Sequence, residues 1–352
     1  MFAPIENNRL YLQTLAMGVV AGLSSALIFA SILTQSSFAL LITIVAPLPL
    51  LIASMGWTTY AGAFAIAIAG IVLSLFTHAD VVYAFLMMIA LPSSILAAAT
   101  TLQVRRLTLQ HDATTGQNHI NTRSWWLSSG VLLVICVVLA SIMIVMSAIR
   151  SGSYELYTGF LRKTCEALIR FHLGIKDQQP IVLPDNMNVD DVLSMMVSII
   201  PVCMGLVMTL YLAFNVWMGA RLVAMSGRLP RPLVSIHQLA LPREMTLVMI
   251  VSAGLSILPE YFGFLGRAMT GAILGAFIIQ GAVALHVLSS GIQSLTLGVK
   301  SRTILLGLFY ATLFLLPWAI LFVAIYGFIT ILARKSQGSQ DPPSPPTPQQ
   351  FS

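Results

Sequence analysis

The chain has 352 residues, of which 57% are hydrophobic and only 9% are Asp, Glu, Lys or Arg. Soluble domains average about 25% charged residues, so this composition excludes a soluble fold and predicts burial in lipid. The net charge of +6 does not indicate nucleic-acid binding, because the basic residues are spread over short loops and form no basic face.

Nine apolar stretches have a length that suggests membrane spans. The second is interrupted at Pro47 and Pro49, whose missing N–H groups must be compensated by neighbouring helices or a cavity. The ninth would measure roughly 46 Å as one helix, and Pro317 predicts either one kinked span or a re-entrant pair. We therefore predict an all-α, polytopic transmembrane helix bundle of about nine spans (8–10), at residues 10–33, 38–54, 57–76, 81–102, 125–149, 191–220, 245–258, 268–290 and 303–333.

Small residues recur four apart in the first stretch, at Gly18, Gly22, Ala26 and Ala30. Small side chains at this spacing let a second helix approach the backbone closely, which predicts a helix-docking surface. The third stretch is also rich in Ala and Gly between residues 61 and 70, so we expect this helix in the middle of the bundle or against a partner.

Basic residues mark one side of the predicted bundle. By parity, the loops after the fourth, sixth and eighth spans lie on the same side, whereas the loops at 34–37 and 77–80 carry no Lys or Arg. The positive-inside rule then places the N-terminus in the cytoplasm. The basic residues are Arg105, Arg106, Arg123, Arg221, Arg228, Arg231, Arg243, Lys300 and Arg302.

The connection at 150–190 is predicted to hold an amphipathic helix on the outer interface, with Arg162–Glu166 and Glu166–Arg170 pairs at i, i+4. This helix either covers the bundle and rests in the headgroups or forms a lid over a substrate cavity. Asn188 and the aspartates around it are expected to cap the sixth span. The organisation follows as membrane helices over 1–149, the outer segment over 150–190, membrane helices over 191–335 and a disordered tail over 336–352.

No catalytic motif of a zinc hydrolase, a nucleotide-binding loop or a serine hydrolase is present, so we predict no enzyme, metal site or cofactor. Polar residues inside the spans are few. Gln280 and His286 are six positions apart and point to different faces, so they cannot form one metal pair. His286 is a ligand or proton relay, makes an interhelical hydrogen bond, or lies at the inner interface of the membrane.

Broken helices are where transporters bind solutes, because unwound backbone offers free polar groups. The interrupted region around Pro47, Pro49 and Gly56 therefore predicts a solute cavity. Its candidate residues are Pro47, Pro49, Gly56, Asn215, Gln280 and His286.

The first six spans resemble the substrate-binding S-components of energy-coupling-factor vitamin transporters. The features that carry this resemblance are the small-residue series from Gly18 to Ala30, the segment from Ala46 to Leu50, and the third helix rich in Ala and Gly. The whole chain is more similar to the uncharacterised bacterial membrane family DUF2232 (YybS-like), through residues 241–243 and 280–286. The resemblance to S-components implies a six-helix bundle that binds a vitamin or metal from outside and docks a coupling subunit through Gly18, Gly22, Ala26 and Ala30.

Two functions follow as hypotheses. The first is a transport-related subunit of the bacterial cytoplasmic membrane, which binds an unidentified small molecule and docks other membrane subunits. The second is a non-transporting protein that serves as a scaffold for envelope assembly. Both take the lipid bilayer as a partner and exclude nucleic acid.

Overall fold

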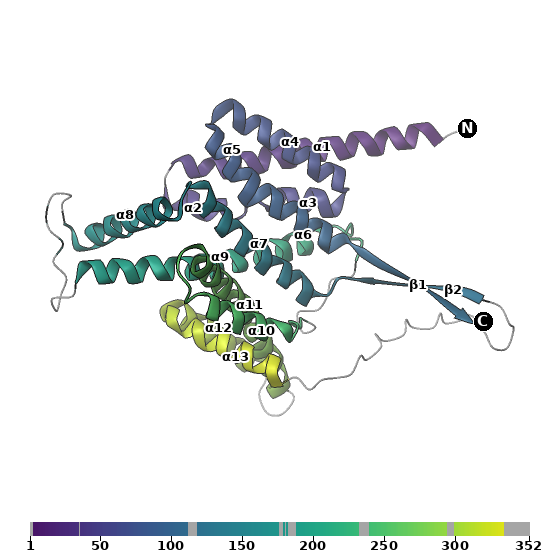
Figure 1. Cartoon of the computed structure of the whole chain (residues 1–352). Helices are drawn as coiled ribbons and strands as arrows, with labels where there is room; N and C mark the ends of the chain where they lie inside the picture. Colours follow the sequence, from purple (N-terminus) through teal and green to yellow (C-terminus); the bar gives the residue numbers. More distant parts are fainter. Residues whose placement is uncertain are drawn as a thin grey trace.

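The computed structural model describes residues 3–34, 36–111, 118–175, 179, 181, 188–231, 239–293 and 299–333, and all statements below concern these residues. They form a helical bundle with one two-stranded hairpin (Figure 1). The elements up to the hairpin are α1 (Ala3–Ala30), η1 (Ser31–Thr34), α2 (Ser37–Thr43), α3 (Leu48–Gly56), α4 (Thr59–Phe76), α5 (Ala79–Phe85), the π-helical turn η2 (Leu86–Ala90) and α6 (Leu91–Thr101). Those after it are α7 (Ser129–Arg150), α8 (Tyr154–Leu173), α9 (Val189–Met225), α10 (Glu244–Leu255), α11 (Glu260–Gln293), α12 (Val299–Leu315), η5 (Pro317–Ala319) and α13 (Ile320–Ala333).

Seven helical segments of the described chain have the length and the apolar composition needed to cross a membrane. They coincide with the first six predicted spans and the eighth. The predicted count of nine is not confirmed, because α10 has only 12 residues and would reach about 18 Å of the roughly 30 Å core. The seven segments are Tyr11–Thr34, Ser37–Gly56, Thr59–Phe76, Ala79–Thr101, Ser129–Arg150, Val189–Met225 and Glu260–Ser289.

The ninth predicted stretch forms two helices instead of one. A short 3-10 turn beginning at Pro317 separates the 17 residues of α12 from the 14 residues of α13. At 1.5 Å per residue these helices measure about 26 and 21 Å, so each is shorter than the hydrocarbon core. The interruption predicted at Pro317 is therefore present.

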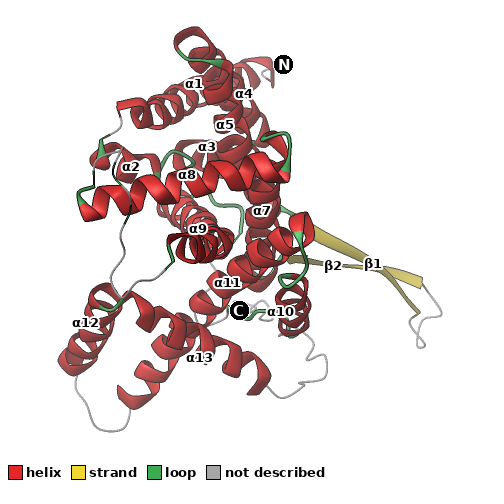
Figure 2. Ribbon diagram, turned by 60° about the vertical axis from the view of Figure 1, so that its left-hand side comes forward, coloured by secondary structure: helices red, strands yellow, loops and turns green. Residues whose placement is uncertain are grey.

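The hairpin corrects the all-α prediction. Strand β1 (Gln103–His111) pairs antiparallel with β2 (Asn118–Trp126), and Gln103 lies opposite Trp126. Figures 1 and 2 show this hairpin projecting away from the helices. The rest of the described chain is helical, with turns and short loops between the helices.

Two hydrophobic cores lie on either side of α3. Leu50 and Ala53 pack in a core formed with α1, α4 and α5, whereas Leu51 and Met55 pack in a larger core formed with α6, α7, α9, α11 and α13. Figure 1 shows the corresponding layers, with α1 and α4 at the top and α10 to α13 at the bottom. Helix α7, which the sequence assigned to the N-terminal unit, belongs to the larger core.

The basic loops meet at one end of the bundle. Nη1 of Arg231 donates to the carbonyl oxygens of Thr100 and Leu127, which joins the loop after α9 to the end of α6 and the start of α7. Helix α11 runs beside α9 in the same direction, since Gly205 contacts Ala268 and Gly275 contacts Leu206. Its C-terminal end therefore lies at this end too. We call this the basic end.

The opposite end carries α8 and the start of α9. The predicted amphipathic helix is present as α8, whose Tyr157 and Leu161 are buried while Phe171 is 82% exposed. Glu166 pairs with Arg170 as predicted, whereas Arg162 reaches across to Asp190 on α9.

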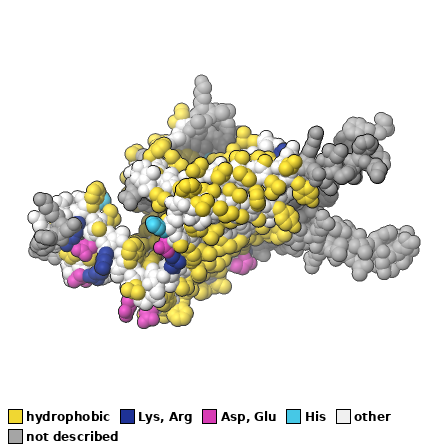
Figure 3. Space-filling view, turned by 90° about the horizontal axis from the view of Figure 1, so that it is seen from above, with side chains coloured by type: hydrophobic (Ala, Val, Ile, Leu, Met, Phe, Trp, Pro, Cys, Tyr) yellow, Lys and Arg dark blue, Asp and Glu magenta, His cyan; other side chains and the backbone are white. Residues whose placement is uncertain are grey.

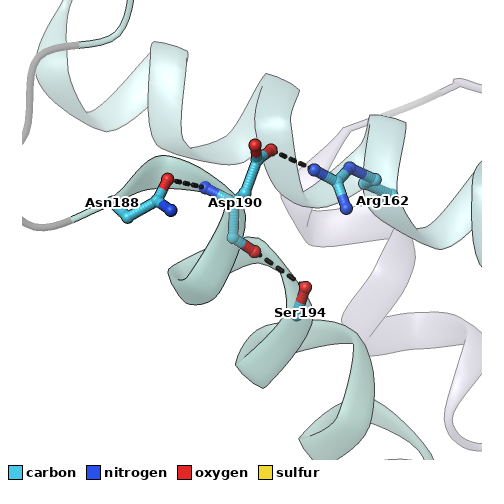
Figure 4. Close-up of polar contacts among 4 residues, drawn as sticks. All are labelled: Arg162, Asn188, Asp190 and Ser194. Carbon is cyan, nitrogen blue, oxygen red and sulfur yellow. Dashed lines mark hydrogen bonds and ion pairs between the residues drawn. The ribbon is translucent and has the colours of Figure 1, made fainter.

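The predicted cap of the sixth span is also present at this end. The Asn188 side chain accepts a hydrogen bond of 3.0 Å from the backbone N–H of Asp190. The Ser194 hydroxyl in turn donates to the Asp190 carbonyl (Figure 4). Asp185, one of the aspartates near Asn188, lies outside the described residues, as does the predicted tail at 336–352.

Hydrophobic side chains form a wide surface over the middle of the molecule in Figure 3, and charged side chains gather toward the end that carries α8. Large apolar side chains on this and other faces are well exposed, among them Phe38, Tyr60, Leu75 and Phe76. Such a surface is compatible with a protein that lies in a membrane.

Candidate functional site

The predicted helix-docking stripe is covered by a helix of the same chain. A Cβ atom on Gly18 would lie 2.8 Å from Cδ1 of Phe64, and one on Gly22 would overlap the carbonyl oxygen of Ala65. Ala26 is buried as well, and Ala30 is partly buried at the end of the stripe. The small residues of α1 thus face the small residues of α4, and the two sequence features predicted separately pack against each other.

The interruption at Pro47 and Pro49 is compensated by a side chain of α9. Nδ2 of Asn215 donates to the carbonyl oxygens of Ile44, at 3.0 Å, and Tyr211, at 2.9 Å. Ile44 lies in the turn between α2 and α3, where the helical hydrogen-bond pattern is broken. A neighbouring helix therefore supplies the polar partner that the sequence predicted for this break.

Gln280 and His286 also hold neighbouring segments in place. Oε1 of Gln280 accepts a hydrogen bond of 3.1 Å from the backbone N–H of Leu241, just before α10. Nδ1 of His286 lies 3.3 Å from the Tyr310 hydroxyl, which joins α11 to α12. Among the roles predicted for His286, an interhelical hydrogen bond matches this geometry.

The six predicted cavity residues do not converge on one space. Gly56 lies beside Val223 in the last turns of α9, whereas Asn215, two turns earlier, faces the break near Pro47 and Pro49. Gln280 and His286 contact α10 and α12 from α11. None of the six lines the cavity that the described residues enclose elsewhere.

That cavity lies among α7, α9, α11 and the segment after α9, and it has a volume of about 500 Å³. Ligand pockets in proteins commonly measure roughly 300 to 1,000 Å³ and are mostly apolar with a few polar groups. Thirteen of the sixteen lining residues are apolar, and the polar ones are Thr100, Ser129 and Arg231. Its size and lining are therefore those of a binding site for a small, largely apolar molecule.

One wall of the cavity reaches the outer surface of the bundle. Phe214 and Trp217 of α9 line the cavity, yet they are 40% and 51% exposed. These two side chains therefore belong both to the cavity lining and to the exposed surface of the bundle. Tryptophan is also enriched where membrane proteins meet the headgroup region.

Arg231 lies at the polar end of the cavity and is only 6% exposed. Its Nη1 donates to Thr100 O at 3.4 Å and Leu127 O at 3.2 Å. Burial lowers the pKa of the guanidinium, which nevertheless stays protonated at neutral pH because arginine titrates far above it. The cavity therefore holds a permanent positive charge at one end.

Sequence reasoning missed Arg231 as a site residue, because it is one of four arginines after the sixth predicted span that together indicate topology. Its one local distinction is that Pro230 and Pro232 flank it. Which of the four folds inward depends on contacts with Thr100 and Leu127, more than a hundred residues earlier in the chain.

Comparison of the chain with family models, curated proteins and solved structures found no match. The resemblances to DUF2232 and to S-components remain predictions.

Proposed function

We propose that this chain is an integral membrane protein that binds a small, largely apolar molecule in the cavity among α7, α9 and α11. The observation that carries the proposal is a cavity of about 500 Å³ whose lining is mostly apolar and includes the exposed side chains of Phe214 and Trp217. A site of this kind suits a solute or lipid taken from the bilayer.

The proposed orientation places the basic end in the cytoplasm of a bacterial cell, with the N-terminus on the same side. Loops rich in Lys and Arg favour the cytoplasmic side of the membrane. Contacts of Arg231 with Thr100 and Leu127 support this placement, because they bring two basic loops to one end.

The proposal keeps the ligand binding of the transport hypothesis but places the binding site among α7, α9 and α11 instead of near Pro47 and Pro49. Asn215 satisfies the Ile44 carbonyl at the break near Pro47, so that region offers a ligand fewer free polar groups. Coupling to transport requires partner subunits, and the small-residue stripe of α1 is covered by α4. A partner would have to dock on another surface.

The experiment is to purify the protein in mild detergent and identify retained small molecules by native mass spectrometry. Ala213→Phe adds a large side chain to the cavity wall and is expected to abolish retention. Val207→Phe is the matched control, because Val207 lies on the same helix but is 62% exposed. It is expected to retain the molecule at the level of the natural chain.

Equal retention by the two variants would contradict the proposed site. Absence of any retained molecule, together with co-purification of envelope-assembly proteins, would favour the scaffold hypothesis instead.

A further inference from the structure

Arg231 has a charge that the described protein residues leave without a counter-ion. The ion pairs of the described chain join Arg150 to Asp80, Arg162 to Asp190 and Arg170 to Glu166, all away from the basic end. Glu244 is the one described acidic side chain near this end, and no ion pair joins it to Arg231. A buried charge without a partner is unfavourable, so such a group is a candidate for function.

The hydrogen bonds of Arg231 leave part of its guanidinium available. Both described bonds use Nη1, and within the described chain Nε and Nη2 donate to no protein oxygen. Neither nitrogen is among the fully buried side-chain atoms that lack a hydrogen-bond partner. Both therefore keep some accessible surface. Adjacent guanidinium N–H groups form a planar fork that matches the two oxygens of a carboxylate or phosphate.

The Thr100 carbonyl helps hold the guanidinium in place. It lies in the last turn of α6, where unpaired carbonyl groups carry partial negative charge and favour a cation. The carbonyl groups of Thr100 and Leu127 orient the guanidinium, but their partial charges do not neutralise a full positive charge. An anion bound in the cavity would supply the missing negative charge.

The rest of the cavity is unsuited to a small hydrophilic anion. Apart from Thr100, Ser129 and Arg231, the lining is apolar and includes the exposed Phe214 and Trp217. The polar group around Arg231 and the apolar remainder of the cavity therefore differ in the chemistry they accept.

From this arrangement we infer that the molecule bound in the cavity is an amphipathic anion, an apolar chain that ends in a carboxylate or phosphate. Arg231 binds the acidic group, and the chain lies against the apolar side chains of α7, α9 and α11. This inference rests on the proposed function, since it names the ligand class of the same cavity. With the basic end in the cytoplasm, the source is the inner leaflet.

The test compares oleate with oleyl alcohol, which share a chain and differ in charge, using native mass spectrometry and thermal unfolding in a nonionic detergent. The natural chain is expected to bind oleate more tightly than the alcohol. Arg231→Gln should weaken oleate binding at least tenfold, the lower range for a charge-assisted hydrogen bond, and leave binding of the alcohol unchanged. Arg231→Lys should recover part of the loss, because it keeps the charge without the fork.

Arg221→Gln is the matched control, because Arg221 is an exposed arginine in the last turns of α9 at the same end. It should bind oleate like the natural chain. Inorganic phosphate and dodecyl phosphate form a second pair, in which the chain-bearing phosphate is expected to bind and the free ion is not. Binding of free phosphate alone would overturn the inference, because it would indicate a site for a hydrophilic anion.

The outcomes separate the two proposals. If both oleate and oleyl alcohol bind and Arg231→Gln changes neither, the anion inference fails while the proposed cavity stands. If neither binds the natural chain, and Ala213→Phe alters no retained molecule, both fail. Binding of the alcohol by Arg231→Gln also shows that this variant is folded.

Discussion

The packing of α1 against α4 differs sharply from the packing around α7, α9 and α11. In the first region Ala61, Ala65 and Ala69 are fully buried, and Gly22 leaves no room for a Cβ atom. In the second, α9 touches α11 closely at Gly205, yet its other side chains include Phe214 and Trp217 and border a cavity of about 500 Å³.

The difference shows how side-chain size distributes space in a bundle. Small side chains let two backbones meet, and the contact leaves no volume for a ligand. In the second region α9 and α11 also meet closely at Gly205, but a cavity persists beside larger side chains that do not interdigitate fully. The contact between α1 and α4 is therefore closely packed throughout, whereas the other region supplies the candidate site.

The largest effect is expected from added bulk at the contact between α1 and α4. Gly22→Leu would force its side chain into the Ala65 carbonyl, and we expect a loss of about 3 kcal/mol in the free energy of unfolding, typical of severe overpacking. Gly70→Leu is the control, since nothing lies within 4 Å of its Cβ position. Denaturant unfolding in detergent measures both, and equal losses would contradict the close contact.

The polar support of the broken helix gives the next largest effect. Asn215→Leu leaves the Ile44 carbonyl without its partner and should cost about 2 kcal/mol. Thr209→Val is the matched change on the same helix, because the buried Thr209 hydroxyl has no described partner. This variant should be neutral or stabilising in the same unfolding assay. A larger loss from Thr209→Val than from Asn215→Leu would show that the assignment of polar contacts on α9 is wrong.

The cavity should tolerate bulk that the α1 contact does not. Ala213→Phe is expected to change the free energy of unfolding by less than about 1 kcal/mol, because the new ring enters existing space. Ala65→Phe, at a fully buried position of α4, should lose about 3 kcal/mol for the opposite reason. Similar losses in the two variants would mean that both regions are equally well packed.

The smallest effect is expected at the end of the molecule that carries α8. Arg162 and Asp190 form an ion pair whose side chains are 44% and 73% exposed, so Arg162→Ala should cost about 0.5 kcal/mol. The loss should shrink as salt is added, since salt screens exposed charges. Lys163→Ala controls for the change in net charge, and an effect that does not depend on salt would argue against an electrostatic origin.

Hydropathy alone located most helices of this protein. Stretches of about twenty apolar residues appear as helices because lipid offers backbone groups no hydrogen bonds, so each segment must satisfy its own. Pro47, Pro49 and Pro317 likewise marked the interruptions, since proline lacks an N–H. The hairpin is not evident from the sequence, because residues 103–124 are mostly polar, carry Arg105, Arg106 and Arg123, and have the pattern of a basic loop between two spans.

Only the tertiary structure decided what each special residue does. The sequence showed that the small residues of α1 would accept a helix, but not that the helix is α4. It singled out Asn215, Gln280 and His286, but their hydrogen bonds hold neighbouring segments and line no common cavity. Arg231 stood among four similar arginines until Thr100 and Leu127, distant in sequence, fixed it at the end of the cavity. Local pattern determines which segments are helical, whereas burial of a charge depends on contacts between segments that the pattern does not contain.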